Sequence, residues 1–469
     1  MSIRSRHAGL RVGRRHRQAF HRDLTAPSLA LLTIGGVMGS GLFLASGLVA
    51  MRAGPIVVGF FLLGAWAMYL EISALAEMAI ATPAPGSFLT YSAEVLGPGW
   101  TFVAGWIFWF SSVLTMSSEV TAAALFTRYW FPAVPIWIWA LAYSAGIVAI
   151  NFLSVRGFGT IEGVMAAVKA VAVAAFILLA AYFVLGPHPV RLMGYQAFLA
   201  HGWLPHGWLG AAPEFLLTLF AYAGTGVVGM AAAETKDPQA TIPKAVRASV
   251  LILASLYVLS MTLVLALVPY FRLSPGMSPF TQALHHLPLP LGAGLMNLVL
   301  LFAVLSTMNA ALYSNVRVLY TLAQQGQAPR ALSRLNARGQ PATAIWTSAG
   351  LLLMTIALAY LLPHQAYGYL VTATGFQAMF IWLMVLFTHL RYRPYLLRHH
   401  PERLRYRLWG YPYTTWFVIL LVILALLASP LAKAELAGAL VGVAGIAAAA
   451  VAWWAVRRSL KPQGAGGQQ

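Results

Sequence analysis

The sequence has no cysteine and very little charge. The absence of cysteine from all 469 residues excludes disulfide bonds, thiolate metal sites and thiol catalysis. Charged residues make up 9% of the chain, whereas a typical soluble domain has about 25%. Hydrophobic residues make up 60%, and the mean hydropathy is +0.75. This composition is that of an integral membrane protein.

Acidic residues are scarcer than basic ones, with 11 Asp and Glu against 30 Lys and Arg. A strongly basic chain can bind nucleic acid, so the positions of the charges must decide what the excess means. If the N-terminus is cytoplasmic, the outer segments hold few basic residues: Arg52, Arg128, Arg191, Arg272 and Lys433. This is the positive-inside pattern. It predicts a cytoplasmic-membrane protein with both termini in the cytoplasm and no nucleic-acid partner.

Long apolar runs follow a basic tail at residues 1–26. A helix crosses the bilayer with about 20 apolar residues. We therefore predict twelve transmembrane helices at 27–50, 55–80, 99–130, 134–153, 160–185, 207–233, 246–270, 290–322, 342–362, 366–390, 411–430 and 434–456. The predicted organisation is a cytoplasmic tail at 1–26, a membrane-embedded core at 27–392, a cytoplasmic loop with two helices at 393–457, and a cytoplasmic tail at 458–469.

The first predicted span contains four glycines at membrane depth, at positions 35, 36, 39 and 41. Each glycine costs a helix interior about 1 kcal/mol relative to alanine, so we predict a break there. A broken helix in a membrane offers amides to anions and carbonyls to cations. Close packing of small residues against a neighbouring helix is the alternative explanation.

A second glycine-rich interruption is predicted in the sixth span, at residues 220–229. It contains a G-x-G-x-x-G pattern, but no βαβ unit surrounds it, so a dinucleotide site is not indicated. Because spans one and six are five apart, we predict a five-plus-five inverted repeat, 27–185 and 207–392, with two additional helices. The predicted fold is all-α, with discontinuous helices one and six.

Four segments carry a resemblance to a known family: residues 34–43, 71–88, 220–245 and 309–329. The chain resembles amino acid permeases of the amino acid–polyamine–organocation superfamily, with the greatest likeness to its bacterial and fungal amino acid transporter family. The resemblance covers residues 24–410. It implies proton-coupled uptake of amino acids through the five-plus-five inverted-repeat fold of sodium-coupled leucine transporters.

The resemblance also implies where the substrate binds. In relatives, the substrate carboxylate meets the amides of a Gly-Ser-Gly segment, and the α-amine meets carbonyls of both broken helices beneath an aromatic gate. The matching residues here are Gly39, Ser40 and Gly41 for the carboxylate, Ile34, Val37, Phe220, Ala221 and Ala223 for the amine, and Phe220 for the gate. Many relatives carry Glu where this chain has Gly226, so that acidic group is missing from its usual place.

Two ionisable residues within the predicted spans are candidates for proton coupling. An ionisable group at bilayer depth costs at least about 2.5 kcal/mol, which indicates a partner or a function. Relatives have a lysine at the position of Lys169, facing the first helix, and we predict that it carries the coupling; a lysine snorkelling to the interface is the alternative. Glu119 either lines the site and shares in coupling or pairs with another buried group.

The other acidic residues near the spans are predicted to have smaller roles. Glu162 is expected at the cytoplasmic interface, and Glu71 and Glu77 are expected in structural roles in the cytoplasmic part of span two. Glu234, which follows span six, either forms an inner gate by ion pairing or is a solvated capping residue. No histidine spacing specifies a metal site.

The predicted function is that of a secondary active transporter importing amino acids by proton symport. Neutral substrates are expected because this chain has Gly226 where many relatives have a glutamate. Glu119 is then the single acidic residue expected near the binding site. The predicted partners are the amino acid, protons and lipid, with no cofactor. An exchanger or facilitator of the same fold is one alternative, and a membrane-embedded enzyme or sensor is another. We find no nucleophile–base or metal-ligand constellation, so an enzyme is not predicted.

Overall fold

The structure is a computed structural model that describes residues 24–84, 87–153, 158–186, 190, 192–232, 235, 237–336, 339–361 and 365–457. The N-terminal tail up to residue 23, the tail from 458 and Glu234 lie outside the described residues. Within the described part, the chain is helical and has no strand beyond an isolated bridge between Leu24 and Thr235.

The helices of the first half include both parts of the first predicted span. Their starts follow local capping chemistry, since the Thr25 side chain accepts a hydrogen bond from Ser28 N and Pro98 opens its helix. The elements are α1 (Ala26–Val37), a π-helical turn (Gly41–Ala45), α2 (Ser46–Ala53), α3 (Val57–Ala81), α4 (Phe88–Val95), α5 (Pro98–Thr127), α6 (Ile136–Leu153), α7 (Phe158–Leu185) and α8 (Met193–His201).

The second half begins with the short helices of the sixth predicted span. Asp237 caps the long helix that follows, accepting hydrogen bonds from Gln239 N and Ala240 N. The elements are α9 (Gly207–Ala211), α10 (Phe215–Phe220), α11 (Gly226–Ala231), α12 (Pro238–Leu267), α13 (Pro279–His285), α14 (Gly292–Gln324), α15 (Ala342–Leu361), α16 (Ala366–His399), α17 (Tyr413–Ala428) and α18 (Lys433–Val456).

Among the described residues, eight helices are long and apolar enough to cross a membrane. Shorter apolar helices occupy Ala26–Val37, Ile136–Phe152, Gly207–Phe220 and Ala342–Ala357. The all-helical fold is therefore confirmed over the described residues, whereas the number twelve and the inverted repeat stay predictions. The helices α4, α8 and α13 were not predicted, because each has fewer than ten residues and no long apolar run.

The helices extend beyond some of the predicted apolar spans. The span predicted at 366–390 lies within α16, which continues to His399, and the span predicted at 246–270 overlaps α12, which begins at Pro238. Hydropathy falls where the chain reaches the edge of the bilayer, but a helix can extend into water beyond it. The sequence pattern therefore located the end of the apolar segment and not the end of the helix.

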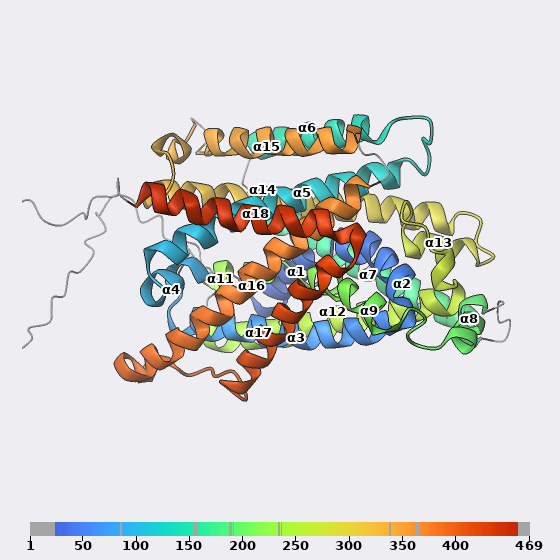
Figure 1. Ribbon diagram of the computed structural model, residues 1–469, viewed down its shortest axis with the longest axis horizontal. Coiled ribbons are helices and arrows are strands. Elements are labelled where there is room, and N and C mark those ends of the chain that lie inside the picture. Colours follow the sequence, from blue (N-terminus) through green and yellow to red (C-terminus); the bar gives the residue numbers. More distant parts are fainter. Residues whose placement is uncertain are drawn as a thin grey trace, which may run out of the picture.

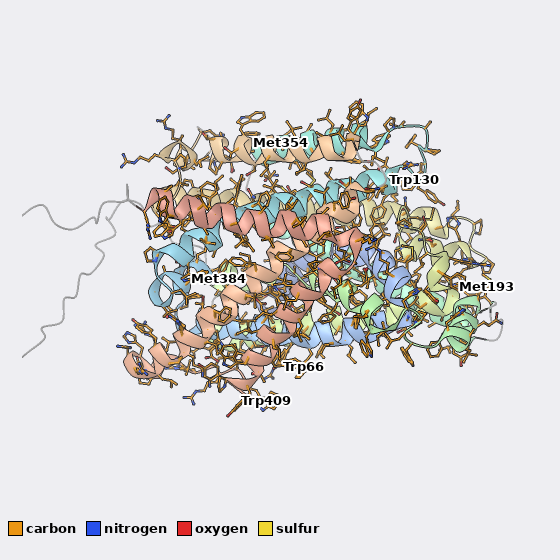
Figure 2. All side chains as sticks on the ribbon, viewed as in Figure 1. Trp66, Trp130, Met193, Met354, Met384 and Trp409 are labelled. Atoms are coloured by element: carbon orange, nitrogen blue, oxygen red, sulfur yellow. The ribbon has the colours of Figure 1, made fainter. Side chains whose placement is uncertain are left out.

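The broken helices lie in the interior of the bundle (Figure 1). The helices α6 and α15 lie side by side along one edge, next to α5 and α14, while α3, α12 and α17 lie on the opposite side (Figure 1). Large apolar side chains such as Trp66 and Met354 lie exposed on the outside of the bundle, as expected of surfaces that face lipid (Figure 2).

Glu77 of α3 anchors the segment that follows α16. Its carboxylate lies 3.2 Å from His389 Nε2 and 3.4 Å from Arg393 Nη1, and it accepts a hydrogen bond of 2.5 Å from Leu408 N. Glu77 is buried, so these contacts are shielded from water. The structural role expected for Glu77 agrees with this geometry.

Glu77→Gln is expected to lower the thermal stability of the detergent-solubilised protein. The amide removes the charge that faces Arg393 and His389, and breaking a buried ion pair costs about 3 kcal/mol. Thermal unfolding of purified protein measures the effect. The control is Glu402→Gln, because Glu402 is exposed and its contacts with His400 and Arg403 are on the surface, where a substitution changes stability by about 0.5 kcal/mol or less. Equal losses in both variants would contradict the anchoring role.

Candidate functional site

The first helix breaks between α1 and the π-helical turn. Met38 N donates to Ile34 O (2.9 Å) and closes α1, and the amides of Leu42 and Phe43 both donate to Gly39 O (3.2 and 3.1 Å). A π-helical turn inside a helix is frequently found at functional sites. The helix continues through Gly35 and Gly36, so the break comes slightly later than the first pair of glycines.

The second break, between α10 and α11, touches the first one backbone to backbone. Gly224 has a φ of +111°, and a Cβ there would meet Gly36 O at 2.5 Å. A Cβ on Gly41 would meet Ala221 Cα at 2.7 Å. Both positions therefore require glycine, one for its left-handed backbone and both for the close approach of the two helices.

A cavity of about 150 Å³ lies where the two breaks meet. Predicted site residues that line it are Val37, Gly39, Gly41, Phe220 and Ala223. Ile34, Ser40 and Ala221 are buried nearby without lining it. Residues of α3, α4, α5, α14 and α16 form the remaining walls, so helices distant in sequence border the cavity.

Glu119 of α5 is bound to the amide predicted to receive the substrate carboxylate. Ser40 N donates to both carboxylate oxygens at 3.0 Å, and Ser40 Oγ donates to Oε1 at 3.0 Å. Glu119 also lines the cavity and is almost fully buried. The two alternatives for Glu119 are therefore both present in the geometry, since it lines the site and is paired with a buried group.

Lys169 of α7 links the first helix to α14. Its Nζ donates to Gly35 O (3.1 Å) and to Thr307 Oγ1 (2.9 Å), and it lies 4.0 Å from Glu162 Oε1. The residue is 1% exposed. Snorkelling to the interface is thus contradicted, because the ammonium group is inside the protein and bonded there.

Two acidic residues have contacts that the sequence did not indicate. Glu162 was expected at the interface, but it is buried, accepts a hydrogen bond from Ser306 Oγ (2.9 Å) and faces Lys169. Glu71, expected in a structural role in the cytoplasmic part of span two, lines the central cavity and accepts from Thr225 Oγ1 (2.8 Å). Hydropathy indicates depth along a helix poorly near its ends, and it does not indicate which neighbour a side chain faces.

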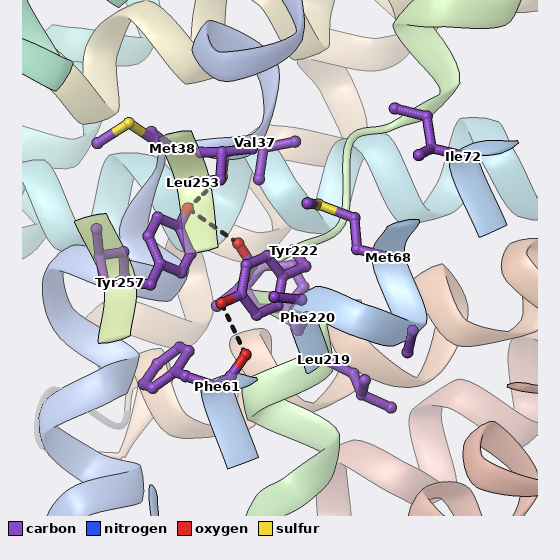
Figure 3. Close-up of a cluster of buried hydrophobic side chains, with 14 of the residues drawn as sticks. Val37, Met38, Phe61, Met68, Ile72, Leu219, Phe220, Tyr222, Leu253 and Tyr257 are labelled. Carbon is purple, nitrogen blue, oxygen red and sulfur yellow. Dashed lines mark hydrogen bonds between the residues drawn. The ribbon is translucent and has the colours of Figure 1, made fainter. Parts of the chain in front are cut away.

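Three hydroxyl groups at the breaks were missed by sequence reasoning. Tyr257 OH donates to Ala221 O (3.2 Å) and to Val37 O (3.5 Å), so it joins the two broken helices (Figure 3). Tyr367 OH donates to Ser40 O (2.9 Å), and Thr307 Oγ1 donates to Met38 O (3.0 Å). These hydroxyls satisfy carbonyls that the breaks leave free. The available signal was a polar side chain within an apolar span.

The two predicted gate residues are Phe220 and Glu234. Phe220 is buried at the end of α10 and lines the cavity, and Gly375 of α16 lies against it. Glu234 lies outside the described residues, so both explanations for it remain predictions. No cluster of three or more metal-ligating side chains occurs in the described part of the chain.

The chain is similar to known amino acid permeases over most of its length. Residues 28–452 match the family model described as amino acid permease. The aromatic amino acid transport protein AroP of Salmonella typhimurium is 34% identical, covering 81% of this chain and 83% of that protein. The probable GABA permease of Pseudomonas aeruginosa is 33% identical, covering 85% of this chain and 84% of that protein.

A solved structure shares the fold. A manganese transporter of Eremococcus coleocola superposes with a TM-score of 0.55 at 15% sequence identity, covering 92% of this chain and 95% of that chain. This likeness shows that the two chains share a fold. The chain therefore belongs to the amino acid permease family and is a multi-pass membrane protein.

Proposed function

We propose that this permease imports neutral amino acids across the cytoplasmic membrane by proton symport, with both termini in the cytoplasm. The observation that carries the proposal is the contact between Glu119 and Ser40. A carboxylate of the protein is bound to the amide predicted to receive the carboxylate of the substrate. One donor site thus has two competing anionic ligands.

This competition couples a proton to the substrate. When Glu119 accepts a proton, its carboxyl group becomes neutral and binds the Ser40 amide less strongly. The carboxylate of the substrate then replaces Glu119 beside Gly39, Ser40 and Gly41. The α-amine then binds backbone carbonyls at the two breaks. Some of these carbonyls already accept a hydrogen bond from a hydroxyl group, and a carbonyl oxygen has a second lone pair for the amine. Substrate and proton therefore favour the same state of the site, which is the thermodynamic requirement for symport.

Lys169 is the second coupling group. Its ammonium binds α1 through Gly35 O and α14 through Thr307 Oγ1, and the carboxylate of Glu162 is nearby. A lysine without water loses its proton more readily than one in water. Deprotonation weakens the attraction between α7 and the first broken helix, which lets them separate during the transport cycle.

The walls of the cavity support neutral side chains in the substrate. Phe88, Phe108, Ile381 and Trp382 give it an apolar lining. Relatives are described as permeases for GABA and for aromatic amino acids. GABA has no side chain, and the side chains of aromatic amino acids are uncharged. A charged side chain would have to give up its water to enter this lining.

Uptake into proteoliposomes tests the proposal. The twenty amino acids and γ-aminobutyrate are supplied as competitors, with and without an imposed pH gradient that is acid on the substrate side. We expect accumulation that disappears when a protonophore removes the gradient, and stronger competition by neutral amino acids than by lysine, arginine or glutamate. Accumulation independent of the gradient would favour an exchanger or facilitator. Arginine uptake unaffected by neutral amino acids would contradict the proposed substrate class.

A further inference from the structure

We propose that Glu71 supplies the negative charge that binds the ammonium group of the substrate. The inference rests on the proposed function, because it assigns a partner within the same cavity. The amine was expected to meet backbone carbonyls alone. Carbonyls offer partial charges, whereas a buried carboxylate offers a full charge at the same cavity wall.

Glu71 is placed in the cavity by the middle of α3. Its side chain is 1% exposed and lines the cavity beside Thr225, Gly224 and Ala223, where the sixth span is broken. Thr225 Oγ1 donates to Oε2 at 2.8 Å. This single hydroxyl orients the carboxylate toward the break at which the amine is expected to bind.

The charges around the cavity favour a cationic ligand group. In the described part of the chain, the ionisable side chains that line the cavity are Glu71 and Glu119, and both are acidic. Glu119 is already bound to Ser40. No Lys, Arg or His among the described residues lies within 4.0 Å of Glu71. A buried carboxylate without a cation is unfavourable, and a bound ammonium group supplies the missing charge.

This assignment agrees with neutral substrates. The α-ammonium group, or the terminal ammonium of γ-aminobutyrate, uses the charge of Glu71. Glu119 is the other acid that lines the described cavity, and the proposed mechanism protonates it when substrate binds, so no second negative charge is left for a cationic side chain. The apolar lining is left to the rest of the substrate.

The chain offers a position from which a second carboxylate could replace Glu71. Gly226 follows Thr225 directly and lines the same cavity. A Cβ at Gly226 meets nothing within 4 Å, and no positive φ strains a side chain there. A glutamate at 226 would therefore enter open space next to the hydroxyl that now orients Glu71.

The test compares amino acids with analogues that lack the amine. Binding is measured by ligand-induced thermal stabilisation and by isothermal titration for four pairs: alanine and propanoate, leucine and 4-methylpentanoate, phenylalanine and 3-phenylpropanoate, and γ-aminobutyrate and butanoate. The proteins are wild type, Glu71→Gln, Glu71→Gln with Gly226→Glu, and Glu71→Gln with Gly226→Gln. Glutamine retains the shape of Glu71 and an oxygen that accepts from Thr225, so the fold is preserved.

We expect the wild type to bind at least one amino acid at least tenfold more tightly than its analogue, and Glu71→Gln to lose that preference. The Gly226→Glu variant should restore the preference, and the Gly226→Gln control should not. A purely structural role for Glu71 would weaken both members of a pair equally. Preserved discrimination in Glu71→Gln, or a wild type that does not discriminate, overturns the inference while gradient-driven uptake still supports the proposed function. A wild type that neither binds nor transports any amino acid would overturn both.

Discussion

Lys169→Ala is expected to lose most of the proton-driven accumulation of substrate. The substitution removes the ammonium that bonds Gly35 O at 3.1 Å and Thr307 Oγ1 at 2.9 Å, and it leaves the buried Glu162 without its nearest cation. Coupling between two sites is typically worth 1–3 kcal/mol, so accumulation should fall about 5- to 150-fold. Binding is expected to be retained if the first helix keeps its shape.

Uptake by proteoliposomes at equal protein content, with and without the pH gradient, measures this loss. Lys433→Ala is the control, because Lys433 is exposed at the start of α18 and has no contact with the cavity at the breaks. Ligand-induced thermal stabilisation shows whether the variant still binds substrate. A Lys169→Ala protein that still accumulates substrate in response to the gradient would show that Lys169 does not couple transport to protons. Glu119 and Glu234 would then be the candidates for proton coupling.

Gly41→Val is expected to abolish substrate binding while the protein can still be extracted in folded form. A Cβ at this position would lie 2.7 Å from Ala221 Cα, so valine must push the two breaks apart. The amides of Ser40 and Gly41 would then move relative to the carbonyls of the sixth span. A displacement of about 1 Å in a binding constellation can cost about 100-fold in rate.

The matched control is Gly146→Val in α6, because a Cβ at Gly146 meets nothing within 4 Å and Gly146 does not line the cavity. It should retain most of its uptake. Size-exclusion chromatography establishes whether each variant is folded, and uptake and thermal stabilisation measure binding. Unchanged affinity in Gly41→Val would show that the site at the first break is misplaced.

The reason for glycine at position 41 differs from the one the sequence suggested. The resemblance predicted that the backbone must be open to the substrate carboxylate. The structure adds that the same glycine lets the first and sixth spans touch. Close packing and ligand access were treated as alternatives for the glycines, and at Gly41 the geometry allows both.

The sequence by itself determined the class of the protein, the approximate positions of its apolar helices and the two interruptions. These features depend on composition and on local backbone preference, which are properties of each segment alone. Low charge and long apolar runs require a membrane, and clustered glycines weaken a helix wherever it lies. The breaks at Met38–Ser40 and between Phe220 and Gly226 were therefore predictable before any neighbour was known.

The tertiary structure alone decided which polar groups meet. Spans of similar hydropathy give no information on how a helix is rotated about its axis or which helix it packs against. The contact between Glu119 and Ser40, the burial of Glu162 beside Lys169, and the position of Glu71 in the cavity all depend on that rotation. Each of these contacts joins residues far apart in the chain, so side-chain partners became visible only once the helices were packed together.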